Sequence, residues 1–140
     1  MNPSIHLGET QFLDANVIIR YLMGDHPEFT TRATQLIESD RDLTISIVVL
    51  GEVGYVLTKV YQVDRIRASD AMIELLNRAN IESYEVDTDI AIDALRLCRP
   101  SGRVSFVDAF LWALVRGAGN AKIWTFDARF PSEGVVLSKP

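Results

Sequence analysis

Four acidic residues lie in otherwise apolar stretches of the sequence, and their types and settings could do chemistry. They are Asp14 in FLDAN, Glu52 in VLGEVGY, Asp108 in SFVDAFL and Asp127 in WTFDARF. If the four converged, their charges would repel one another, and only protons or bound cations would relieve that repulsion. Oxygen ligands without Cys or His favour hard ions such as Mg²⁺ or Mn²⁺. Carboxylate-held metals of this kind suit phosphoryl chemistry.

Each acid also has a purely structural interpretation. Asp14 could cap a helix, and Asp108 could form a capping box with Ser105. Glu52 could pair with a basic residue, and Asp127 could close an Asx turn. We favour one shared site because it explains the four similar settings together.

Alternating strands and helices are expected to position these acids. The pattern predicts a three-layer α/β/α sandwich with a mainly parallel central sheet. Asp14 and Asp127 each end a predicted strand, so both are expected at the carboxyl edge of that sheet. The predicted strands cover 10–14, 43–47, 81–86, 121–126 and 134–138, and the predicted helices cover 16–24, 27–39, 47–61, 64–79, 88–98 and 106–119.

The whole chain fits one compact domain over residues 1–140, with a loose N-terminal segment at 1–9. Its 140 residues are 48% hydrophobic and 24% charged, as in an ordinary soluble globular protein. The apolar runs are too short for a membrane span, and the N-terminus lacks a secretory signal pattern. The lone Cys98 excludes an internal disulfide and suits a reducing compartment. We therefore expect a cytoplasmic protein without membrane contact.

The charge balance limits how the chain could bind nucleic acid. The formal net charge of −5 argues against a broad basic surface that binds phosphate backbones by itself. Bound divalent metal could still supply positive charge locally. With only His6 and His26 present, histidine-based acid–base catalysis is poorly supplied.

Four motifs together resemble the PIN-domain ribonucleases, most closely the VapC toxins of prokaryotic toxin–antitoxin pairs. The motifs are FLDANVIIRYL, SIVVLGEVGYVL, FVDAFLWAL and WTFDARF, and the similarity runs from Phe12 to about Leu137. No single motif is specific, but their order and spacing make a strong match. The resemblance implies the PIN fold and an Mg²⁺-dependent, or Mn²⁺-dependent, endoribonuclease.

The resemblance also implies roles for individual residues. Asp14, Glu52 and Asp108 would be the core metal ligands, and Asp127 would be the fourth acid. Ala15 stands where many relatives have Thr or Ser, which removes a possible hydrogen bond to the site. The residues that would orient the acids are Asn16, Ser46 and Thr125. Arg20 and Arg129 follow the first and last motifs closely enough to approach substrate phosphate, although surface arginines are commonly solvated or paired.

The implied partners are an RNA substrate, a small antitoxin that covers the acidic groove, and a second toxin chain in a homodimer. One alternative is a PIN-like module that binds RNA or protein without cleaving it. Another is an Mg²⁺-dependent phospho-accepting signalling domain, which would want paired acids after the first strand and a lysine ending a late strand. A dehalogenase-type phosphatase would want D-x-D, whereas this chain has Asp14-Ala15-Asn16.

Two further features carry structural expectations. Tyr55, Trp112 and Trp124 lie among apolar neighbours, which favours packing in the core or in a dimer over stacking on bases. Gly51 and Gly54 flank Glu52 inside a predicted helix, where each costs about 1 kcal/mol relative to alanine. Close approach of another helix or of a partner would explain that cost.

Overall fold

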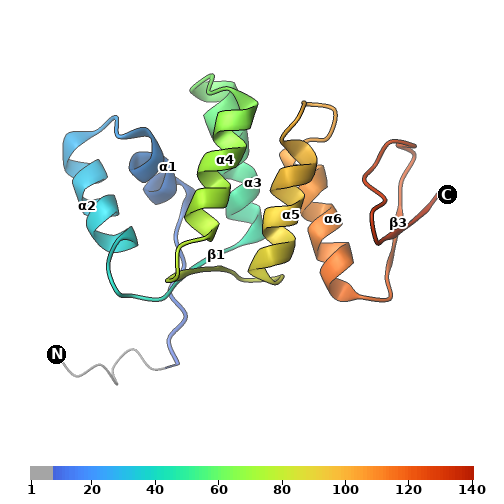
Figure 1. Cartoon of the computed structure of the whole chain (residues 1–140), viewed down its shortest axis with the longest axis horizontal. Helices are drawn as coiled ribbons and strands as arrows, with labels where there is room; N and C mark the ends of the chain where they lie inside the picture. The colour runs from blue at the N-terminus through green and yellow to red at the C-terminus, as the bar shows by residue number, and fades with distance from the viewer. Residues whose placement is uncertain (1–7) are drawn as a thin grey trace.

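The computed structural model describes residues 8–140, and most of the N-terminal segment expected to be loose (1–9) lies outside the described residues (Figure 1). Residues 8–140 contain six α-helices and four short strands, with two helices before each of the first three strands and the last two strands consecutive. The helices are α1 (Ala15–Met23), α2 (Pro27–Ile37), α3 (Ile47–Tyr55), α4 (Arg65–Leu76), α5 (Thr88–Cys98) and α6 (Phe106–Ala118), with a π-helical turn, η2 (Val56–Val60), after α3. The strands are β1 (Leu43–Ile45), β2 (Ile81–Ser83), β3 (Lys122–Trp124) and β4 (Val136–Ser138).

The helix boundaries follow local signals in the sequence. Helix α1 ends at Gly24, whose φ of 63° is in the left-handed region that glycine adopts without strain. Helix α2 opens with Pro27 in its first turn. The single helix expected over 47–61 is instead α3 followed by η2, where the Tyr61 N–H donates to the Val56 carbonyl at 3.0 Å.

All strand pairings are parallel, which confirms the predicted α/β class. Strand β1 pairs with β2, with Leu43 opposite Ile81, and β3 pairs with β4. The expected first strand is reduced to one parallel bridge between Phe12 and Thr44. The strands form two separate sheets, β1–β2 and β3–β4, so the expectation that the 121–126 strand shares a sheet edge with Asp14 is not met within this chain.

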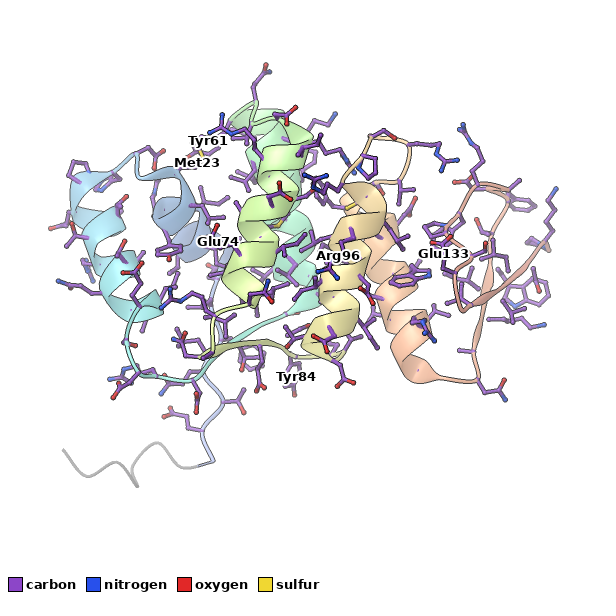
Figure 2. The ribbon with its side chains drawn as sticks, viewed as in Figure 1. Met23, Tyr61, Glu74, Tyr84, Arg96 and Glu133 are labelled. Carbon is purple, nitrogen blue, oxygen red and sulfur yellow. The ribbon has the colours of Figure 1, made fainter. Side chains whose placement is uncertain are left out.

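The position of β3 and β4 is fixed by contacts with α6. In Figure 1 this strand pair lies at the opposite end of the molecule from α1 and α2, beyond α5 and α6. The indole N–H of Trp112 on α6 donates to the Glu133 carbonyl at 2.9 Å, and Phe130 is buried. Glu133 is labelled between α6 and the C-terminal strands in Figure 2. These contacts hold the unit away from the β1–β2 sheet.

Helices α3 and α6 pack closely because α3 has no side chain at two positions. A Cβ atom on Gly54 would lie 2.5 Å from Cγ of Phe106, and one on Gly51 would lie 3.8 Å from Cγ2 of Val107. The expectation of a close approach at these glycines is confirmed, and α6 is the element that approaches.

The aromatic residues separate into buried and exposed ones. Trp112 is buried as expected, whereas Tyr55 and Trp124 are 60% and 62% exposed. These two residues therefore do not pack in the core of one chain, and their packing in a dimer stays a prediction. None of the helices in the described part of the chain is both long and apolar enough to cross a bilayer.

Candidate active site

The carboxyl edge of the β1–β2 sheet gathers polar residues that begin the following elements. Asp14 comes directly after Leu13, whose N–H donates to the Thr44 carbonyl at 2.9 Å. The Asp14 carboxylate accepts from the Ala15 N–H at 2.8 Å and serves as the N-cap of α1. Ser46 follows β1 and is the N-cap of α3. Asp14 therefore has the capping geometry expected from its structural interpretation, and its carboxylate remains exposed.

Glu85 is a third polar residue at this edge, and it was not predicted from the sequence. Its carboxylate accepts from the Ser46 hydroxyl and from the Ile47 N–H, both at 2.8 Å. A carboxylate at the N-terminus of α3 is favoured by the helix dipole. Glu85 follows a strand as Asp14 does, and that position was the available signal. The alternating pattern of IESYEV instead placed it within the predicted strand.

Glu52 and Asp108 are carried by the two helices that pack through glycine. Glu52 follows Gly51 on α3, and Asp108 follows Val107 on α6, so both acids lie at the level where the helices touch. Asp108 is half-buried, and its N–H donates to the Ser105 hydroxyl at 3.0 Å. The packing of α3 against α6 brings these two predicted ligands to neighbouring elements.

Asp127 lies apart from the other three acids, after β3. Its carboxylate accepts from the Arg129 N–H at 2.9 Å, and its own N–H donates to the Thr125 hydroxyl at 3.0 Å. This is the Asx turn of the structural interpretation. Thr125 thus orients the Asp127 backbone, while Arg129 is exposed.

Asn16 and Arg20 line a cavity of about 480 Å³ between α1 and α2. The Arg20 guanidinium is paired with Asp25 at 3.1 Å, and the Tyr61 hydroxyl donates to Asp25 at 2.7 Å. The hydrogen bond from Tyr61, together with Arg20, lowers the pKa of Asp25 below its usual value. Arg20 is therefore engaged in an ion pair with Asp25, and its contact with substrate phosphate stays a prediction.

The donor chemistry of the four acids suits a hard divalent cation, but their placement in one chain does not form a site. Across residues 8–140, no three side chains among Asp, Glu, His and Cys lie close enough to share an ion. The predicted convergence of Asp14, Glu52, Asp108 and Asp127 is therefore absent from a single chain. Two of the four are borne by packed helices, one caps α1 at the sheet edge, and Asp127 is on the separate β3–β4 unit.

The sequence profile of the PIN domain matches residues 12–133, which is most of the chain. The chain belongs to the PIN domain family. PIN domains are typically nucleases, and they generally use divalent metal ions.

Comparison with other proteins adds one structural relative of this PIN domain. The chain is similar to the Mycobacterium tuberculosis toxin VapC20, whose crystal structure is described as that of a sarcin–ricin loop cleaving toxin. The two share 24% sequence identity with a TM-score of 0.43, and the match covers 94% of this chain and 100% of that one. No curated protein sequence matches the chain.

Proposed function

We propose that this PIN domain is a metal-dependent endoribonuclease, and that it acts as the toxin of a toxin–antitoxin pair. The observation that carries the proposal is the family match over residues 12–133, with acids present at Asp14, Glu52, Asp108 and Asp127. Divalent ions bound by carboxylates provide Lewis-acid chemistry suited to phosphodiester hydrolysis. We further propose that the chain functions as a single domain in the cytoplasm.

The roles of this chain's own residues follow from where they lie. The helix-borne Glu52 and Asp108 supply negative charge at the α3–α6 contact, and Asp14 supplies it at the sheet edge. Ser46 and Glu85 fix the start of α3 and so the position of Glu52 in its second turn. Thr125 orients Asp127 through its hydrogen bond.

The proposed partners are an RNA substrate and an antitoxin, and both would approach the face that carries Glu52 and Asp108. RNA is negatively charged and the chain has a formal net charge of −5, so RNA would need bound metal ions to approach these acids. An antitoxin could cover the same face with apolar and basic side chains. VapC20 is described as a toxin that cleaves the sarcin–ricin loop. For this chain we propose RNA as the substrate class and name no particular RNA.

A cleavage assay with Mg²⁺ or Mn²⁺ tests the proposal. Asp108→Asn keeps size and hydrogen-bonding capacity but removes the charge, so we expect RNA cleavage to fall by ~10²-fold or more. Asp93→Asn is the matched control, because Asp93 is an exposed acid on α5 paired only with Arg96. Equal activity of wild type and Asp108→Asn, with both folded, would rule out Asp108 as a metal ligand.

A non-catalytic RNA-binding or protein-binding module is the second candidate. It is favoured by the absence of any group of three metal-binding side chains within residues 8–140. Under that alternative, wild-type protein would bind RNA or a protein partner without metal and would cleave nothing. The same cleavage assay, run beside a binding assay without metal, separates the two candidates.

A further inference from the structure

The strand at Phe12 has an open edge. The Leu13 N–H donates to the Thr44 carbonyl at 2.9 Å, and the Thr44 N–H donates to the Gln11 carbonyl at 2.8 Å. Backbone groups alternate in direction along a strand, so the N–H and C=O of Phe12 point to the opposite edge. No other described residue hydrogen-bonds to them. The Phe12 side chain is 51% exposed, with the Tyr84 ring edge-on to it.

Strand β3 has the complementary open edge. The Thr125 N–H donates to the Ser138 carbonyl of β4 at 2.9 Å, so the backbone groups of Trp124 point away from β4. Within residues 8–140, β3 pairs with no strand on that side. Trp124 and Phe126 are 62% and 80% exposed, and Phe126 directly precedes Asp127. Unpaired edges flanked by large apolar side chains are templates for pairing with another chain.

An uncovered apolar stripe surrounds the predicted acids. Val107, Leu111 and Leu114 are exposed at i, i+4 and i+7 on one face of α6, with Val107 at 65%. On α3, Val48 and Tyr55 are exposed about one turn on either side of Glu52. A partner that covers this stripe would also approach Glu52 and Asp108.

In the observed arrangement of residues 8–140, the chain does not cover these features with its own β3–β4 unit. Only residues 119–121 connect α6 to β3, a reach of about 10 Å. The unit is bound to the far side of α6 through the Trp112–Glu133 hydrogen bond and buried Phe130. A second copy of the chain has the same two open edges. The β3 edge of each copy can therefore pair with the Phe12 edge of the other.

We propose that two copies of this chain exchange their β3–β4 units across a two-fold axis. The β3 edge of one copy then extends the sheet of the other at Phe12, and Asp127 of the partner subunit is brought to the sheet edge that carries Asp14. This inference deepens the proposed ribonuclease function and rests on it. It accounts for the separation of Asp127 from Asp14 in one chain, because the strands that precede these two acids would pair only between copies.

Symmetry, area and charge agree with this arrangement. Each copy offers one edge of each kind, so a two-fold axis satisfies both edges twice and closes the assembly. The exposed parts of Phe12, Trp124 and Phe126 amount to roughly 400 Å² per chain, taking 150–250 Å² for a whole aromatic side chain. Two copies thus supply about half of the ~1,600 Å² of a stable interface from three aromatics alone. The unit also brings Lys122 and Arg129 toward an acidic face.

Mixing two inactive variants tests the exchange. Asp14→Asn and Asp127→Asn are first shown to be inactive alone, then unfolded together and refolded. In an exchanged heterodimer one site carries both substitutions and the other carries neither. A random mixture should therefore recover about one quarter of wild-type cleavage. No recovery, from variants that refold and associate as the wild type does, would overturn the exchange.

A disulfide test reads the same interface without ribonuclease activity. Phe12→Cys and Trp124→Cys chains are mixed and oxidised; native Cys98 is buried and can stay. We expect a covalent dimer from the mixture. A single chain that carries both Phe12→Cys and Trp124→Cys is the second arm. If it forms a cross-linked monomer, the two edges meet within one chain and the proposal is refuted. A covalent dimer without wild-type cleavage would leave the interface standing and overturn the proposed function. Cleavage by an uncross-linked monomer would support the proposed function and overturn the proposed interface.

Solution mass covers the case in which the cysteine variants fail to fold. Wild-type protein should be a dimer, and Trp124→Ser should shift it toward monomer because the exchange places this side chain in the interface. The substitution should leave each chain folded, because Trp124 is already exposed in one chain. Phe29→Ser is the matched control, an exposed aromatic on α2 away from both open edges, and it should remain dimeric. A monomeric wild type, or equal masses for the two variants, would contradict the exchange.

Discussion

The contact between α3 and α6 can be tested by adding one methyl group at each of two glycines. A Cβ on Gly54 would meet three ring atoms of Phe106 at 2.5 to 2.8 Å, closer than such contacts occur. The Phe106 ring cannot swing away easily, because the Arg65 guanidinium lies 4.3 Å from its centroid and Arg65 also binds the carbonyls of Cys98 and Val104. We therefore expect Gly54→Ala to force the helices apart.

The magnitude follows from two opposing effects. Overpacking a core costs about 1–3 kcal/mol, while alanine gains about 1 kcal/mol over glycine in a helix. A contact at 2.5 Å lies at the costly end of that range, so Gly54→Ala should lower the free energy of unfolding by about 2 kcal/mol. Gly51→Ala is the matched control, because its Cβ would make ordinary contacts at 3.8 and 3.9 Å. It should be neutral or stabilising by up to about 1 kcal/mol.

Urea and thermal unfolding followed by circular dichroism measure the difference. The melting temperature of Gly54→Ala should lie roughly 3–8 °C below that of the wild type, and that of Gly51→Ala should not fall. Under the proposed function, Gly54→Ala should also lower RNA cleavage, since it displaces α6, which carries Asp108, from α3, which carries Glu52. Equal stability of the two variants would show that α3 and α6 do not pack as described.

Two further predictions concern hydrogen bonds of acidic side chains. Glu85→Ala should destabilise the protein by about 1 kcal/mol, because the exposed carboxylate caps α3 through Ser46 and Ile47; Glu82→Ala on β2 should not, and equal losses in urea unfolding would refute the capping role. Asp25 has a lowered pKa, so its stabilisation is present above its unfolded pKa near 4 and is lost as pH falls through the folded value. Asp25→Asn should therefore reduce the difference in unfolding free energy between pH 7 and pH 3, and an unchanged difference would contradict the Tyr61 and Arg20 contacts.

Much of the helical structure could be predicted from local sequence signals. Helix α5 occupies 88–98 as expected, and Gly24 and Ser105 mark the end of α1 and the start of α6. The turn η2 could not be predicted, because its i→i+5 hydrogen bonds leave almost the same apolar periodicity as an α-helix.

The pairing of strands was beyond local sequence reasoning. The pattern of AKIWTF identifies a strand but says nothing of its partner, which depends on contacts remote in sequence. Here the hydrogen bond from Trp112 to Glu133 and the burial of Phe130 decide that β3 pairs with β4 beyond α6. The acids themselves were readily noticed from their apolar settings, but their distances depend on this pairing.

Binding of Mn²⁺ tests most directly whether Asp108 belongs to a cation site. Isothermal titration should show that wild-type protein and Asp93→Asn bind Mn²⁺ with the same affinity, whereas Asp108→Asn binds at least ~10-fold more weakly. Equal affinity of Asp108→Asn and wild type, with both variants folded, would contradict the assignment of this carboxylate to a metal-dependent active site.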